Sequence, residues 1–195
     1  CTNLKLAAET IGWAIYYNAG QTCNAGSRII VESAVKDELF AHLAEFSKNF
    51  KVGNPLNPET MMGPLVSKVQ RDRVNSYLEL LGSNGEIVNF GGEKSTGDNL
   101  FIQPTLVSNV KNNSRLAQEE IFGPVLVVLR AQTLDEAIRL VNQNPYGNGT
   151  AIFTRDGGAA RQFEFDVQVG MVGINVPIPV PVSYYSFGGW KASLF

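Results

Sequence analysis

Residues 124–144 read PVLVVLRAQTLDEAIRLVNQN and join an apolar stretch to an amphipathic one. Residues 124–130 are apolar on both faces, which is typical of a central strand in a parallel sheet. Thr133 then precedes two acidic residues. A threonine side chain can accept the first N–H groups of a helix, and carboxylates favour its first turn. The stretch therefore predicts a strand followed by a helix, the repeating unit of an α/β domain.

The same alternation continues on both sides of this stretch. Further helices are predicted over residues 4–20, 35–50, 67–85 and 157–165, with Gly20 as the stop of the first. Strands are predicted over residues 27–33, 86–90, 103–107, 149–154 and 169–176. We expect a single α/β domain over residues 1–195, with an open, largely parallel twisted sheet flanked by helices.

Composition excludes several classes of protein. The 195 residues are 44% hydrophobic, enough for a sizeable core, and a net charge of −2 gives no sign of a nucleic-acid partner. No apolar run approaches the ~20 residues that span a bilayer, and no signal or lipidation motif is visible, so we expect no membrane partner. Cys1 and Cys23 do not make a disulfide framework, which favours a reducing compartment. We expect the cytoplasm or, in a eukaryote, the mitochondrial matrix.

Cys23 lies in the polar stretch NAGQTCNAGSR, residues 18–28, between a predicted helix and a predicted strand. Gly20 and Gly26 flank it and allow close backbone approach. A thiol in such a loop is accessible, as a nucleophile must be, but it also needs a base and an oxyanion hole. A nucleophile and a half-buried thiol without a role both remain open. His42 lies mid-helix and nothing brings it to Cys23, so a Cys–His hydrolase is not supported.

Two other stretches carry candidate site residues. Glu119 and Glu120 precede the central strand, where a carboxylate could bind a ribose or an amine, or could simply belong to an acidic turn. Neither GxGxxG nor GxxxxGK[ST] occurs, so no phosphate-binding loop is predicted, and we expect no metal site. Phe187 and Trp190 follow alternating prolines, which exclude a central strand. They could form a wall over the sheet or the aromatic lining of a substrate pocket.

Taken together, three motifs resemble those of the aldehyde dehydrogenase superfamily. YYNAGQTCNAGSR (16–28) resembles its nucleophile motif, EEIFGP (119–124) its cofactor motif and SFGGWKAS (186–193) its C-terminal motif. They occur in the family's order and at similar separations, and the resemblance covers essentially the whole chain. It implies an α/β catalytic domain that oxidises an aldehyde with NAD or NADP.

The resemblance also implies roles for individual residues. Cys23 matches the catalytic thiolate, whose own backbone N–H donates to the oxyanion. Glu120 matches the carboxylate that binds the nicotinamide ribose, and Phe122 the aromatic that positions the nicotinamide ring. The residues that fall where the family lines its aldehyde pocket are Tyr17, Thr22, Asn24 and Phe187. Attack by Cys23 on an aldehyde gives a thiohemiacetal, hydride transfer leaves a thioester, and water or coenzyme A takes the acyl group.

Several features of the family are absent from this sequence. The ELGG-type motif with the general-base glutamate, the side-chain amide of the oxyanion hole, the nucleotide-binding domain and the oligomerisation strand are not found. The chain begins at Cys1 and ends on KASLF, so we expect the catalytic domain of a longer protein, a homodimer or homotetramer when intact. We expect this domain to be inactive by itself. The alternative is a folded structural module without catalysis.

The two parts of the chain resemble different subfamilies. Residues 144–195 resemble methylmalonate-semialdehyde dehydrogenases, which transfer the acyl group to coenzyme A. Those enzymes typically carry arginine before the cysteine, whereas Thr22 resembles the hydrolytic aldehyde dehydrogenases. The two patterns meet near residues 141–147, so either the subfamily is unusual or the chain is a natural or engineered composite. The sequence leaves three choices open: the substrate (aldehyde or semialdehyde), the cofactor (NAD or NADP) and the acyl acceptor (water or coenzyme A).

Overall fold

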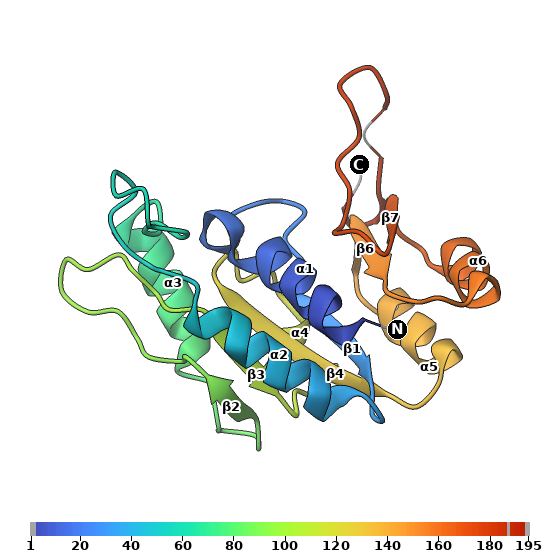
Figure 1. Ribbon diagram of the computed structural model, residues 1–195, viewed down its shortest axis with the longest axis horizontal. Helices are drawn as coiled ribbons and strands as arrows, with labels where there is room; N and C mark the ends of the chain where they lie inside the picture. Colours follow the sequence, from blue (N-terminus) through green and yellow to red (C-terminus); the bar gives the residue numbers. More distant parts are fainter. Residues whose placement is uncertain (1–2, 187, 194–195) are drawn as a thin grey trace.

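The protein has a four-stranded sheet at its centre (Figure 1). The computed structural model describes residues 3–186 and 188–193. The strand order is β1-β4-β3-β2, formed by β1 (Arg28–Glu32), β2 (Ile87–Phe90), β3 (Thr105–Ser108) and β4 (Val125–Ala131). β4 pairs parallel with β1 and β3, while β2 adds an antiparallel edge. The predicted largely parallel α/β sheet is confirmed.

Helices pack against this sheet. α1 (Leu4–Tyr16) and α2 (Lys36–Lys48) lie side by side over one face, and α3 (Lys68–Leu78) lies beside the β3–β2 end (Figure 1). Gly12 lets α1 and α2 meet closely, because a Cβ there would lie 2.4 Å from the Phe46 ring. Both faces of β4 are covered, since six of its seven residues are buried and only Arg130 is exposed.

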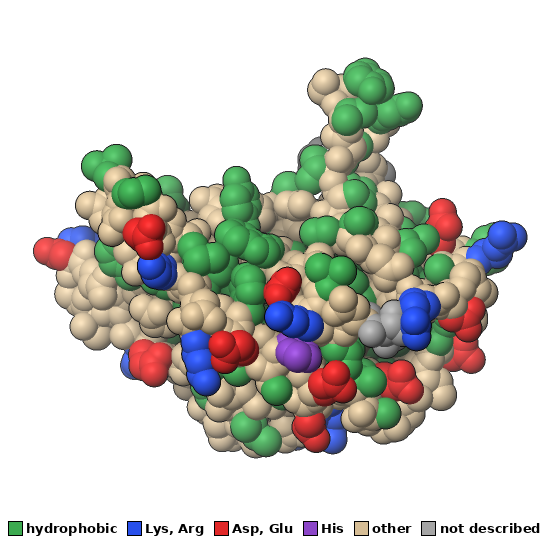
Figure 2. Space-filling view, viewed as in Figure 1, with side chains coloured by type: hydrophobic (Ala, Val, Ile, Leu, Met, Phe, Trp, Pro, Cys, Tyr) green, Lys and Arg blue, Asp and Glu red, His purple; other side chains and the backbone are tan. Residues whose placement is uncertain are grey.

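From α5 to β8, the described residues form a C-terminal lobe with its own apolar cluster. Its elements are α5 (Leu134–Asn142), β5 (Tyr146–Gly147), β6 (Gly149–Ile152), α6 (Gly157–Asp166), β7 (Met171–Ile174) and β8 (Trp190–Lys191). β6 and β7 pair parallel, and β5 and β8 pair antiparallel, apart from the main sheet. Residues 175–186, which follow β7, project as an arm (Figure 1) whose tip carries apolar side chains (Figure 2). Tyr184 and Tyr185 are among its exposed residues.

Some predicted boundaries are wrong. α1 ends at Tyr16 rather than at Gly20, because Asn18 and Ala19 adopt left-handed φ values of 50° and 55° within a short 3-10 turn, η1 (Tyr17–Gly20). α3 ends at Leu78 rather than near residue 85, since turns with Gly82 and Gly85 at positive φ follow it. The four-residue helix α4 (Arg115–Gln118) was not predicted, and the tail, expected to be irregular, contributes β8.

No helix within the described residues combines the length and apolarity needed to cross a membrane.

Candidate functional site

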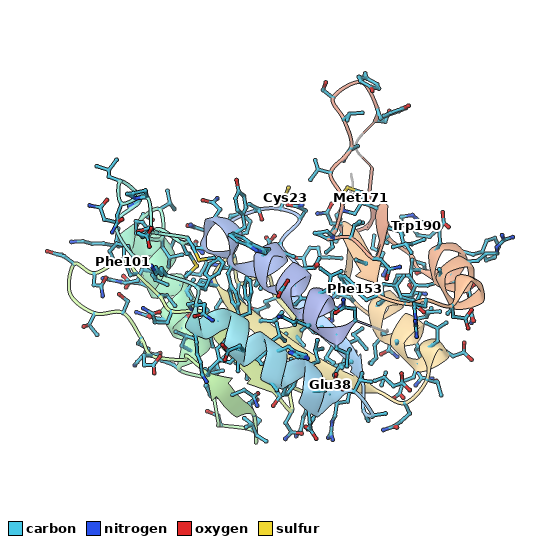
Figure 3. All side chains as sticks on the ribbon, viewed as in Figure 1. Cys23, Glu38, Phe101, Phe153, Met171 and Trp190 are labelled. Carbon is cyan, nitrogen blue, oxygen red and sulfur yellow. The ribbon has the colours of Figure 1, made fainter. Side chains whose placement is uncertain are left out.

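Cys23 lies on the loop between η1 and β1, where the chain enters an edge strand of the main sheet. The thiol is free and exposed. Figure 3 labels Cys23 above α1, on the side of the molecule from which the arm projects. Among the described residues, no group accepts a hydrogen bond from the Cys23 backbone N–H. The predicted accessibility of the thiol is confirmed, and a backbone donor lies beside it.

The loop before Cys23 is in direct backbone contact with the EEIFGP segment. Gly20 has a φ of +71°, and a Cβ there would lie 2.1 Å from the Gly123 carbonyl oxygen. Any side chain at this position would therefore clash with backbone, besides having to adopt an unfavourable φ. Two motifs that are far apart in sequence thus become neighbours through a contact that only glycine permits.

The two glutamates of the EEIFGP segment have different surroundings. The Glu119 carboxylate accepts hydrogen bonds from Arg115 Nε (2.9 Å) and Nη2 (3.0 Å) and from the Tyr77 hydroxyl (2.9 Å). These donors, Arg115 first and Tyr77 second, lower the pKa of Glu119 to about 2. Glu120 is exposed, and no described residue donates to its carboxylate. Glu120 is therefore the carboxylate of this pair that remains available to a ligand.

α3 holds the backbone of the same segment through two side chains that no sequence motif indicates. Arg73 Nη2 donates to the Glu120 carbonyl oxygen at 2.6 Å. Gln70 Nε2 donates to the carbonyl oxygens of Ile121 (3.3 Å) and Phe122 (2.8 Å). Phe122 has a φ of 59°, which is uncommon for a residue other than glycine and requires support from its surroundings. The i, i+3 spacing of Gln70 and Arg73 puts both on one helix face, but nothing in sequence identifies their targets.

The structure places three of the four predicted pocket residues. Thr22 and Asn24 flank Cys23, and Tyr17 begins η1 with 62% of its surface exposed. Asn24 Nδ2 donates to the Ile178 carbonyl oxygen at 3.0 Å, so its amide also ties the loop to the arm. Phe187 lies outside the described residues. The positions of Thr22 and Asn24 suit a pocket around the thiol, and their roles stay predictions.

His42 lies on α2, as predicted, with its side chain about one-third exposed (Figure 2). Its Nε2 is 3.9 Å from Glu38 Oε1 on the same helix, so its ionic neighbour is this carboxylate rather than Cys23. Within residues 3–186 and 188–193, no group of three or more His, Cys, Asp or Glu side chains is placed to hold a metal ion.

Two cavities lie elsewhere on the described surface, one of them lined in part by Arg115. One, of about 140 Å³, is lined by residues such as Glu86 and Ser114, and the other, of about 240 Å³, by residues such as Lys36 and Arg130. Neither is lined by Cys23 or Glu120, so neither of them is a ready-made substrate pocket at the thiol.

Comparison with known proteins matches the aldehyde dehydrogenase family over residues 1–195. The malonate-semialdehyde dehydrogenase of Pseudomonas aeruginosa is 42% identical over 198 residues, covering 99% of this chain and 40% of the relative. Malonate-semialdehyde dehydrogenase 1 of Geobacillus thermodenitrificans is 36% identical over 196 residues, with the same two coverages. The chain thus spans about 40% of the length of these curated relatives.

Solved structures of aldehyde dehydrogenases also match this chain. Betaine aldehyde dehydrogenase from Staphylococcus aureus, in complex with NAD+, superposes with a TM-score of 0.92 at 35% identity, covering 98% of this chain and 38% of that one. A structure assigned as a methylmalonate-semialdehyde dehydrogenase from Sinorhizobium meliloti, complexed with NAD, gives 0.93 at 37% identity, with coverages of 98% and 40%. The curated matches cross both parts of the chain, not residues 144–195 alone. These matches favour the enzyme hypothesis over a module without catalysis.

Proposed function

Because the chain belongs to the aldehyde dehydrogenase family, we propose that it is the nucleophile-bearing catalytic domain of an enzyme that oxidises a semialdehyde with a nicotinamide dinucleotide. The observation that carries this proposal is the backbone contact between Gly20 and Gly123. It brings the turn that leads into the exposed Cys23 against the segment that offers the free Glu120 carboxylate.

In this proposal Cys23 performs the covalent step. Its thiolate attacks the aldehyde carbon, and the free backbone N–H of Cys23 donates to the oxygen as negative charge develops there. A nicotinamide, when bound, would supply the acceptor for the hydride that leaves the thiohemiacetal carbon. The acyl group would then stay on the Cys23 sulfur as a thioester. Water or coenzyme A then takes the acyl group, which restores the thiol.

The residues present fit a nicotinamide dinucleotide on chemical grounds. A free carboxylate such as that of Glu120 can accept hydrogen bonds from the two hydroxyls of a ribose. Phe122, held in its left-handed conformation by Gln70, can present an aromatic face to a planar ring. We assign these roles to Glu120 and Phe122, with NAD as the first cofactor to test and NADP as the second.

The substrate proposal follows the names of the relatives. Since malonate-semialdehyde dehydrogenases match the full chain, a small aldehyde that carries a carboxylate is the first candidate. Tyr17, Thr22, Asn24 and Phe187 would line its pocket. We further propose that the nucleotide-binding and oligomerisation parts of the parent enzyme lie outside residues 1–195, and that the parent is a homodimer or homotetramer.

The nucleophile can be tested without a cofactor. p-Nitrophenyl acetate acylates an activated thiolate and releases coloured p-nitrophenol. We expect about one equivalent of rapid release from the wild-type chain and from Cys1→Ala, the matched control for the second cysteine, but none from Cys23→Ala. A wild-type chain without a burst, or a burst that survives in Cys23→Ala, would refute the proposal.

A further inference from the structure

Two side-chain amides tie the Cys23 loop, residues 21–27, to the C-terminal lobe. Asn148 Nδ2 donates to the carbonyl oxygen of Cys23 itself at 2.8 Å, across 125 residues of sequence. Asn24 Nδ2 donates in the opposite direction, to the Ile178 carbonyl oxygen at 3.0 Å. Among the described residues these are the hydrogen bonds that join the loop to the lobe. The bond from Asn148 is the one that reaches the candidate nucleophile.

Asn148 is itself held firmly. It lies between β5 and β6, and its carbonyl oxygen accepts from the N–H groups of Gly170 and Met171, each at 3.1 Å. The glycines on either side are closely packed. A Cβ would lie 2.6 Å from the Gln168 carbonyl oxygen at Gly147, and 2.4 Å from the Ile178 side chain at Gly149. The Asn148 amide is therefore presented from a fixed backbone, as a group that orients another must be.

A bond to the Cys23 carbonyl restricts the cysteine more than a bond elsewhere in the loop would. The carbonyl and the following N–H lie in one planar peptide unit, so fixing the oxygen fixes the rotation between the Cys23 Cα and that plane. The loop's own contact at this point is a single turn bond, from the Ala25 N–H to the Thr22 carbonyl oxygen at 3.1 Å. The Asn148 bond adds the external restraint at Cys23.

We propose that Asn148 is a positioning residue for Cys23. It holds the Cys23 backbone so that the sulfur and the Cys23 N–H face the same carbonyl group, one toward its carbon and the other toward its oxygen. The Asn148 amide donates to the Cys23 carbonyl oxygen and acts on the cysteine through that bond. This inference rests on the proposed function, in which Cys23 is the nucleophile.

The test compares two reactions of the same thiol. Acylation by p-nitrophenyl acetate needs both the sulfur and the N–H in place, whereas alkylation by iodoacetamide needs only an accessible thiolate. For Asn148→Ala and Asn148→Leu we expect acylation to slow about 10-fold or more. Alkylation should change by less than about threefold, with an unchanged pH midpoint, because the thiolate keeps its exposure and charge surroundings.

Asn142→Ala is the matched control. Asn142 is another amide of the C-terminal lobe, which donates to the Asp166 carbonyl oxygen and accepts from the Gln168 N–H, both at 2.8 Å, without a bond to the Cys23 loop. It should leave both rates unchanged. Trypsin cuts after Lys5 and Arg28, so mass spectrometry reads Cys1 and Cys23 on separate peptides.

The outcomes separate this inference from the proposed function. Acylation that slows more than alkylation in both Asn148 variants supports the positioning role. Unchanged acylation, or equal losses in both reactions, overturns it while a Cys23-dependent burst leaves the proposed function standing. If the wild-type chain gives no burst, the proposed function fails, and the positioning role that rests on it fails too. Where a burst is seen, hydrogen exchange of residues 21–27 is a second check: faster exchange in the Asn148 variants than in Asn142→Ala supports the restraint, and equal exchange overturns it.

Discussion

Two adjacent glutamates, Glu119 and Glu120, lie just before β4 and differ in their hydrogen bonding. Glu119 is bound by Arg115 and Tyr77, whose ring also lies under the Arg73 and Arg115 guanidinium groups at 5.5 and 5.3 Å from its centre. Among the described residues, Glu120 is engaged through its backbone oxygen, by Arg73, and its carboxylate has no donor. The first glutamate is therefore part of the structure of the segment, and the second is left for a ligand.

This difference predicts how the free energy of unfolding depends on pH. The pKa of Glu119 is lowered from 4.5 to about 2, so its bonds stabilise the folded chain above about pH 4.5, and this stabilisation is lost as the pH falls toward 2. When the pH is lowered from about 4.5 toward 2, Glu119→Gln should lose less unfolding free energy than wild type. Urea denaturation at several pH values measures this loss. Glu164→Gln, on the exposed side of α6, controls for the change in net charge. Parallel curves for wild type and Glu119→Gln would contradict the prediction.

At the scale of elements, β4 connects the main sheet, the core and the candidate site. It pairs on both sides within the main sheet, and its residues contribute to the main apolar cluster. Its first residue follows the Gly123–Pro124 turn, which contacts Gly20 just before the Cys23 loop. β4 also leads directly into α5, where Thr133 Oγ1 accepts from the Glu136 N–H at 3.2 Å, as its position before an acidic turn predicts. The same strand therefore supports the core and one wall of the candidate site.

We expect Leu126→Ala, near the start of β4, to lower the free energy of unfolding by about 2–5 kcal/mol, because Leu126 is completely buried and truncation leaves a cavity. Leu56→Ala is the matched control, since Leu56 is 90% exposed and should change stability by no more than ~0.5 kcal/mol. Chemical denaturation of the two variants measures the difference. Similar losses in both would mean that β4 is not central to the core.

At the scale of the whole molecule, the proposed site combines the Cys23 thiol with few proposed contacts to a cofactor. Of the residues assigned to the nicotinamide, Glu120 and Phe122 are present, and the chain spans about 40% of its curated relatives. Hydride transfer requires the ring to be held against the reacting carbon, and such positioning can contribute ~7–11 kcal/mol to lowering the barrier. Glu120 and Phe122 alone can supply little of this positioning.

We therefore expect the 195-residue chain to give no sustained NADH fluorescence with NAD+ and malonate semialdehyde, although its Cys23 reacts with p-nitrophenyl acetate. Sustained NADH formation that disappears in Cys23→Ala would contradict this expectation. Formation that persists in Cys23→Ala would come from a contaminant, which a second purification of the same variant would identify.

The sequence by itself determined the α/β class, the central place of β4, the cap of α5 and the three motifs that indicate the family. These follow from periodicity and from residues close together in the chain, where the chemistry is local. Only the tertiary structure decided where α1 ends, which glutamate is free, and that Gln70, Arg73 and Asn148 hold the candidate site. Each of these depends on a partner brought close by folding, such as the Cys23 carbonyl 125 residues from Asn148, and no local pattern encodes such a contact.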